Sequence, residues 1–285
     1  MIQVPQRAEV DHFLSTGNYD NAFENWPGAT FVERATQGST ALRTALISAV
    51  LERARHAAVP ICLETIDLDV FARAKFAPMV RGLFPQRERR VILDLLVRSL
   101  VVLSPATIAT VLAKTPWLRT AWNLANLYLA SIAAERLSAD APEIVGLSEG
   151  TTCYVSAAYF RTNHRFDDYV VHEAAHIFHN CKRQTIGLPG SRHREWLLEI
   201  DFAKRETFAY ACEAYSRILK LGGTRPTRHR LVSELAEGAM PPDERVDGAE
   251  YVDILREAVA ARNGWKCIRE RCSSPKPARR SSEAS

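Results

Sequence analysis

Apolar residues recur at the spacing of an α-helix over most of the chain. Between residues 32 and 55, Leu42, Leu46 and Val50 fall on one face of a helix that turns once every 3.6 residues. The same periodicity predicts further helices over residues 68–80, 91–103, 115–137, 167–181, 203–221, 229–237 and 248–262. The chain is therefore expected to be mostly helical.

Hydroxyl residues, proline and glycine mark the ends of several of these helices. Thr115 can cap a helix start, and Pro116 fits the first position, where the missing N–H of proline costs nothing. Ser104 and Pro105 repeat this arrangement. Gly222 is expected to end the helix over residues 203–221.

One segment breaks the helical pattern. Residues 138–150 contain Pro142, Gly146 and Gly150, and the following ten residues, TTCYVSAAYF, are rich in the types that favour strands. We therefore predict an α+β fold that is predominantly α-helical, with a small sheet. The expected division is a helical N-terminal region (1–145), a region around residues 167–181 (146–265) and a basic, disordered tail (266–285).

The composition of the 285-residue chain is that of an ordinary globular protein, with 47% hydrophobic and 25% charged residues. The most apolar stretch, residues 91–103, is interrupted by Asp94 and Arg98 and is too short to cross a bilayer. The first thirty residues show no secretion-signal pattern, and the six cysteines lack a CxxC pair. We therefore expect reduced thiols, a cytoplasmic location and no membrane partner, with the oligomeric state left open.

Charge argues against a nucleic-acid partner for the whole protein. The 37 basic and 33 acidic residues leave a net charge of only +4. Basic residues are concentrated near the C-terminus, at Lys266, Arg269, Arg271, Lys276, Arg279 and Arg280. Such a tail is more often solvated than bound to nucleic acid, so a nucleic-acid contact is the weaker interpretation.

The segment DDYVVHEAAHIFHNC, residues 167–181, carries the candidate chemistry. On a helix, His172, His176 and His179 share one face with Tyr169, while the opposite face is apolar. The apolar face consists of Val170, Val171, Ala174, Ile177, Phe178 and Cys181. Asp167 or Asp168 is expected to cap the start of this helix.

Two histidines four residues apart point the same way, so both can bind one zinc ion. Glu173 is turned about 100° from His172. There it is placed to accept a proton from a zinc-bound water, and it is not placed as a ligand. Chance alone would give the HExxH pattern only about 0.02 times in a chain of this composition. The residues therefore favour a zinc site over a surface helix that merely displays histidines.

HEAAH resembles the signature of the zincin metallopeptidases, whose two histidines and catalytic glutamate would be His172, His176 and Glu173. The resemblance covers about residues 150–220 and implies a peptidase whose substrate strand pairs with the sheet edge, here TTCYVSAAYF. It leaves the helical first half unexplained.

A catalytic zinc also needs a third protein ligand. Glu206 lies thirty residues after His176 on the polar face of the next helix, an arrangement that resembles the gluzincins. The metzincin pattern is absent, and His179 lies too far along its helix, where an outer role is favoured. Glu213, Glu199, Asp201 and His193 remain alternative ligands.

Further roles depend on the same helix. Many gluzincins carry an acidic residue four positions after the ligand, but Tyr210 stands there and is a candidate to hydrogen-bond the oxyanion. His193, Tyr154 and Tyr215 are other candidates, although Tyr215 belongs to an apolar face. Glu213 is expected to pair with Arg217 on the solvated part of the helix.

The sequence thus predicts a zinc-dependent metallopeptidase that acts on a peptide or protein substrate, with His172, His176 and Glu206 as ligands. The alternative is a non-catalytic binding or regulatory module on the same scaffold. The substrate and the position of cleavage are not determined.

Overall fold

The chain forms two units whose sequence segments alternate. One unit consists of Met1–Asp67 with Leu100–Asn163, and the other of Leu68–Ser99 with His164–Ser285. The computed structural model describes residues 4–57, 66–142, 144, 146–161, 165–191 and 194–273. Residues 68–99, which sequence reasoning assigned to the N-terminal region, therefore belong with the histidine helix.

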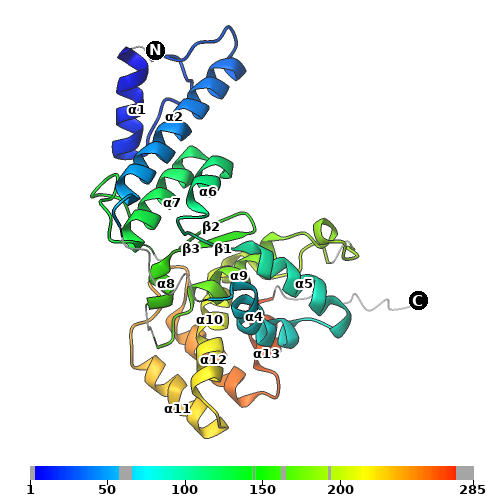
Figure 1. Cartoon of the computed structure of the whole chain (residues 1–285). Helices are drawn as coiled ribbons and strands as arrows, with labels where there is room; N and C mark the ends of the chain where they lie inside the picture. Colours follow the sequence, from blue (N-terminus) through cyan, green and yellow to red (C-terminus); the bar gives the residue numbers. More distant parts are fainter. Residues whose placement is uncertain are drawn as a thin grey trace, which may run out of the picture. The chain divides into compact units, whose positions relative to one another are not determined.

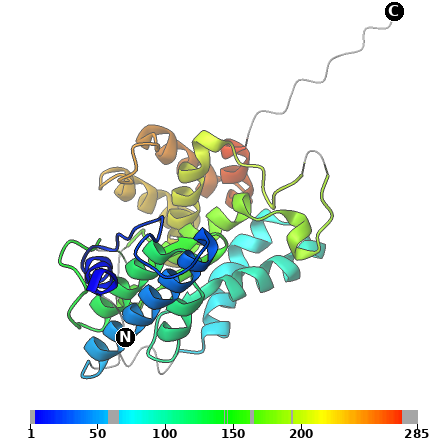
Figure 2. The same ribbon diagram turned by 90° about the horizontal axis from the view of Figure 1, so that it is seen from above.

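The first unit packs helices around α2 (Phe31–Ala54). Its other helices are α1 (Val4–Thr16), α6 (Ile108–Lys114), α7 (Leu118–Ser131) and α8 (Ala157–Arg161) (Figures 1 and 2). α2 contacts α1, α6 and α7. It buries Leu42, Leu46 and Val50, as its periodicity predicts, and Thr30 and Glu33 form a capping box at its start. Helix α7 buries most of its residues in the same cluster, so the core of the unit lies between α2 and α7.

A small mixed sheet completes this unit. β1 (Leu100–Val102) pairs in parallel with β3 (Thr152–Val155), and β2 (Gly146–Glu149) pairs with β3 in antiparallel, in the order β1-β3-β2. The pairing of β1 also changes a predicted helix boundary. The helix over residues 91–103 ends at Ser99 because the β-branched Val101 and Val102 pair with β3.

The predicted strand and the predicted long helix are both shorter than expected. Only Thr152–Val155 is extended within residues 151–160, because the Ser156 Oγ accepts the Ala158 N–H and α8 begins. Helix α7 ends at Ser131, since Ala133 has a positive φ of 55° that stops helical geometry. Trp117 stands at the N-cap of α7 and Thr107 at that of α6, so the predicted caps, Thr115 and Ser104, are not the capping residues.

The second unit is helical and is organised around α10 (Arg205–Leu221). Its other helices are α4 (Leu68–Leu83), α5 (Gln86–Ser99), α9 (Tyr169–Asn180), α11 (Arg225–Ala236), α12 (Gly248–Ala260) and α13 (Gly264–Cys272), with 3₁₀ turns at Arg183–Ile186 and Phe202–Lys204 (Figure 1). α10 contacts α9, α11, α12 and α13, and α4 lies beside α5 (Figure 2). α10 ends at Leu221, before Gly222, as predicted.

Helix α13 corrects the predicted tail. Residues 266–272 are helical because Trp265, Ile268 and Cys272 recur at helical spacing and are buried. Lys266, Arg269 and Arg271 form ion pairs with glutamates on α12 and α13. The remaining basic residues of the predicted tail lie outside the described residues. The basic end is therefore partly a packed helix.

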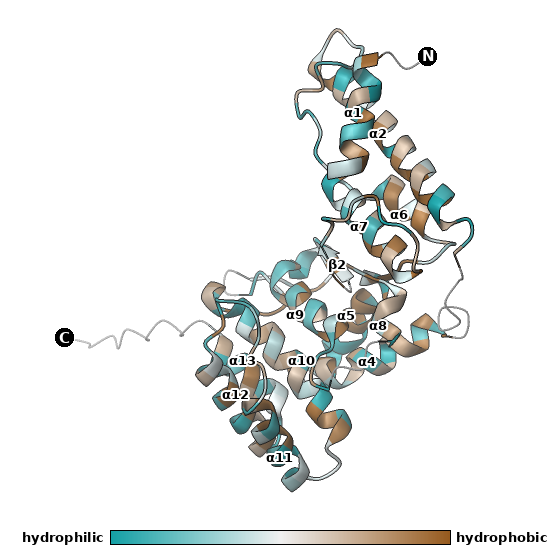
Figure 3. Ribbon diagram, turned by 90° about the vertical axis from the view of Figure 1, so that its left-hand side faces the viewer, coloured by the Kyte–Doolittle hydropathy of each residue, from teal (hydrophilic) through white to brown (hydrophobic). Residues whose placement is uncertain are grey.

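The fold class is α+β and predominantly helical, as predicted. Hydrophobic and hydrophilic residues are interspersed along the helices of both units, as expected for helices with one buried face (Figure 3). Among the described residues, no helix combines the length and the apolar character that crossing a membrane requires.

Candidate metal centre

Helix α9 presents its histidines on one face and packs with the other. Val170, Val171, Ala174, Ile177 and Phe178 are all buried, which confirms the predicted apolar face. Phe178 meets Phe84 edge-on, with ring centroids 5.0 Å apart. The opposite face is covered by α10, so His172 and His179 are buried as well. This packing holds the imidazoles in a partly dry site.

Three donor atoms from α9 and α10 converge on one point. The Nε2 atoms of His172 and His176 lie 3.1 Å apart, and Glu206 Oε2 lies 3.7 Å from the first and 3.4 Å from the second. Atoms that bind one tetrahedral zinc ion at about 2.0–2.1 Å lie about 3.4 Å from one another. The spacing therefore fits a zinc ion with three protein ligands.

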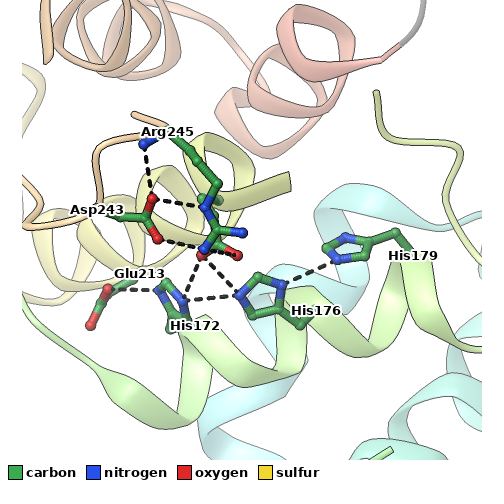
Figure 4. Close-up of polar contacts among 7 residues, drawn as sticks. His172, His176, His179, Glu213, Asp243 and Arg245 are labelled. Atoms are coloured by element: carbon green, nitrogen blue, oxygen red, sulfur yellow. Dashed lines mark hydrogen bonds and ion pairs between the residues drawn. The ribbon is translucent and has the colours of Figure 1, made fainter. Parts of the chain in front are cut away.

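The other ring nitrogen of His172 is held by a carboxylate. Glu213 Oε2 lies 3.2 Å from His172 Nδ1 (Figure 4). Glu213 Oε1 accepts the backbone N–H of Asp168. The Asp168 carboxylate in turn pairs with Lys75 of α4 at 2.6 Å. With Nδ1–H donated to Glu213, the Nε2 lone pair is directed to the candidate metal position.

Two predictions about these residues were wrong. Asp168 stands at the N-cap of α9, but its side chain makes no capping bond and instead pairs with Lys75. Glu213 is buried and turned toward His172, whereas a solvated pair with Arg217 was expected. It lies seven residues after Glu206, two helical turns on, and so occupies the same face of α10.

His176 is supported in a corresponding way by His179. Their Nδ1 and Nε2 atoms lie 3.1 Å apart (Figure 4). Burial, with the neighbouring charges of His176 and Arg205, lowers the pKa of His179 to about 3, so this ring is neutral at pH 7. A neutral His179 can accept the Nδ1–H of His176, which leaves the His176 Nε2 lone pair toward the same position. The outer role expected for His179 therefore agrees with its geometry.

An arginine from the loop between α11 and α12 reaches Glu206, and an aspartate from the same loop binds that arginine. Arg245 Nη2 lies 3.1 Å from Glu206 Oε1, the carboxylate oxygen that is not directed at the histidines. Asp243 accepts hydrogen bonds from Arg245 Nε at 2.9 Å and from Nη2 at 2.5 Å. The Arg245 side chain is 64% exposed, whereas that of Glu206 is 16% exposed.

Charges around the site favour a cation. Burial lowers the pKa of His172, but hydrogen bonds to Glu206 and Glu213 outweigh burial and raise this pKa to about 9. Hydrogen bonds from His172 and His176 hold the pKa of Glu206 well below its ordinary value. Burial raises the pKa of Glu213, against the effect of its hydrogen bonds. Positive charge between these carboxylates is therefore stabilised, as a metal ion requires.

Glu173 and Tyr210 both interact with His172. Glu173 follows His172 on α9, is half-buried, and its charge contributes to the raised pKa of His172. The Tyr210 ring lies edge-on to the His172 ring, with centroids 4.4 Å apart. Burial and nearby carboxylates raise the pKa of Tyr210 to about 12, so its hydroxyl remains a hydrogen-bond donor at neutral pH.

The other candidate residues that the structure describes make their contacts away from the three donor atoms. Glu199 accepts the backbone N–H groups of Glu195 and Trp196, and Asp201 accepts that of Ala203. Tyr215 packs on Trp265 in the core, as expected. Tyr154 is buried in β3 of the first unit, and His193 lies outside the described residues.

Sequence reasoning missed Asp243, Arg245 and Lys75. Their sequence neighbourhoods contain no spacing that relates them to HExxH, because they come from a loop and from the distant α4. For Glu213 the sequence did contain a signal, because its position on the same face of α10 as Glu206 could have indicated that it lies at the site.

No known protein-family model matches the chain, and neither a curated protein nor a solved structure matches it significantly. The function must therefore be argued from the site itself.

Proposed function

We propose that the chain is a zinc-dependent metallopeptidase of the zincin type, with His172, His176 and Glu206 as zinc ligands and Glu173 as general base. The observation that carries this proposal is the spacing of 3.1–3.7 Å among three donor atoms from α9 and α10. The Nδ1 contacts of both histidines support it, since metal-binding imidazoles are usually held from their other nitrogen.

Zinc fits the donor set better than a hard cation does. Two neutral imidazoles and one carboxylate form a ligand set used by catalytic zinc, whereas magnesium and calcium prefer oxygen ligands alone. When bound, the ion would polarise the substrate carbonyl and lower the pKa of the attacking water. We also propose a cytoplasmic location for the protein, as expected from its sequence.

The protein residues would carry the proton transfers. Glu173 accepts a proton from the attacking water as the new C–O bond forms. It then gives that proton to the amine nitrogen as the C–N bond breaks, so that Glu173 returns to its starting state. Tyr210, protonated because its pKa is about 12, donates a hydrogen bond to the negative charge that develops on the carbonyl oxygen.

The first test separates metal binding from catalysis. Purified wild-type protein should contain one zinc ion, measured by metal analysis, and His172→Ala should lose it, whereas the exposed α11 variant His229→Ala should keep it. Equal zinc in wild type and His172→Ala would refute the metal site.

The second part of the test addresses cleavage of a cell-derived peptide mixture, read by mass spectrometry. Glu173→Gln should keep zinc but lose cleavage, since the ligands remain and the base does not. If the wild type binds zinc and cuts neither these peptides nor folded proteins, the non-catalytic module becomes the better reading.

A further inference from the structure

Arg245 is a fixed positive charge at the exposed edge of the candidate metal centre. Its guanidinium touches Glu206 on one side, and its side chain is 64% exposed. The side chains of His172, His176 and Glu206 are only 11%, 18% and 16% exposed. Exposure thus increases from the donor atoms toward Arg245, so a molecule that enters from solvent meets this residue beside the ligands.

Asp243 fixes the orientation of the guanidinium and leaves part of it available. The two oxygens of Asp243 accept hydrogen bonds from Nε and Nη2, the bidentate arrangement that suits a carboxylate. The backbone N–H of Arg245 also donates to Asp243, which tightens the turn. Within the described part of the chain, Arg245 Nη1 makes no hydrogen bond or ion pair. The site thus holds an arginine nitrogen, pre-positioned at low entropic cost, for a further acceptor.

We propose that Arg245 binds the C-terminal carboxylate of the substrate peptide and thereby makes the protein a carboxypeptidase; this inference rests on the proposed peptidase function. The carboxylate of a terminal residue lies within one residue length, about 3.8 Å, of the bond to be cut. Arg245 contacts Glu206, the proposed third ligand. A terminal carboxylate bound to Arg245 would therefore place the last peptide bond beside the donor atoms of His172, His176 and Glu206.

The existing contact between Arg245 and Glu206 supports this choice of ligand. It shows that the guanidinium already meets a second carboxylate besides Asp243. When a cation draws charge from Glu206, the attraction between Arg245 Nη2 and Glu206 weakens, and a substrate carboxylate can then bind Nη2 together with the available Nη1. An exposed guanidinium suits an anion that arrives with the substrate better than it suits a developing charge, which is stabilised best in a water-excluded site.

The test compares peptides of one sequence that end in a free carboxylate or in an amide. Wild type should remove single residues from the free-acid peptides, with kcat/KM about 10- to 100-fold higher than for the amides, because a hydrogen-bonded charge pair contributes that much. Arg245→Ala should lose this factor on free acids alone, chiefly through a higher KM. Arg245→Lys should recover part of it, since lysine keeps the charge without the fork.

A matched control is Arg256→Ala, which removes an exposed arginine paired with Asp253 on α12 and should behave as wild type. A second readout needs no turnover. Zinc-loaded Glu173→Gln protein should bind the intact free-acid peptide at least about tenfold more tightly than the amide by calorimetry, and Arg245→Ala should abolish the difference.

Outcomes distinguish this proposal from the proposed function. Cleavage of free acids and amides at equal rates, or an equal loss on both in Arg245→Ala, would overturn the carboxypeptidase assignment while leaving the peptidase in place. Amidated peptides that end in Asp or Glu are a further check. If they bind as tightly as the free-acid peptides, a side-chain carboxylate is the ligand of Arg245, and the carboxypeptidase assignment is overturned. If wild type cuts no peptide, the peptidase proposal fails, and the binding comparison alone decides whether Arg245 receives a terminal carboxylate.

Discussion

The two sides of the histidine pair differ in how strongly they are fixed. On the inner side, the Nδ1 atoms meet Glu213 and His179, and the side chains of Glu213 and Asp168 are at most 9% exposed. On the outer side, the Nε2 atoms meet Glu206, which is linked to the exposed Arg245. The inner side sets the direction of the imidazoles, and the outer side is where the proposed ion and substrate would bind. In each ring, Nδ1 thus makes the buried contact that holds the imidazole in place, and Nε2 faces the more accessible side.

The largest expected effect comes from removing the outer carboxylate. Glu206→Ala should lower zinc affinity by more than about 100-fold, because it removes one of three ligands, whereas loss of an outer partner typically costs 10- to 100-fold. A competition titration with a zinc chelator measures this. Glu199→Ala, a glutamate that caps a loop, is the matched control and should bind zinc as wild type does. Similar affinities in the two variants would mean that Glu206 is not a ligand.

A smaller effect should follow from changing the inner carboxylate. Glu213→Gln should lower zinc affinity by about 10- to 100-fold, since the amide still fits but no longer holds His172 Nδ1–H with a negative charge. The same titration measures it, with thermal unfolding of the zinc-free protein to show that the fold persists.

His179→Phe sharpens the comparison between the two histidines. This variant keeps a ring but removes a neutral acceptor, so its effect should lie at the lower end of that range. If His179→Phe lowered zinc affinity more than Glu213→Gln, the neutral contact to His176 would matter more than the charged contact to His172. That result would contradict the ranking of the two inner contacts.

A pH dependence of zinc affinity, set by His172, comes last because it changes the affinity by only about tenfold for each pH unit. The pKa of His172 is raised from 6.5 to about 9, so its protonated form stabilises the zinc-free fold fully below about pH 6.5 and loses this contribution as pH rises through 9. Zinc must displace that proton, so its affinity should rise about tenfold per pH unit up to pH 9. Chelator titrations at several pH values measure this slope, and a flat profile between pH 7 and 9 would contradict it.

Periodicity was enough to predict which residues share a helix face. Phe178 and Val170 are buried on the face opposite His172 because a helix turns once every 3.6 residues, and Glu206 and Glu213 share one face of α10 for the same reason. The fold class also follows from these patterns. What a helix face meets in space does not follow, which is why Glu213 was taken for a solvated residue although it lies against His172.

Contacts from loops and distant helices were beyond the sequence. Arg245 reaches Glu206 through the turn that its partner Asp243 stabilises, and no helical or strand spacing encodes such a contact. Lys75 joins Asp168 across 93 positions of the chain. The shortened strand at Val155 shows the same limit, since a local serine bond, not strand propensity, decides where it ends.

The alternation of the two units along the chain has a consequence for synthesis on the ribosome. Helices α4 and α5 emerge well before α9, α10 and α13, yet α4 packs against all three and buries Phe76, Met79 and Val80. The nascent chain must therefore expose the apolar face of α4 until α13 has been made, roughly 170 residues after the end of α5, and such exposed apolar surface favours aggregation. A truncated protein that starts at residue 146 would lack α4 and α5 altogether and should aggregate, however complete its zinc ligands are.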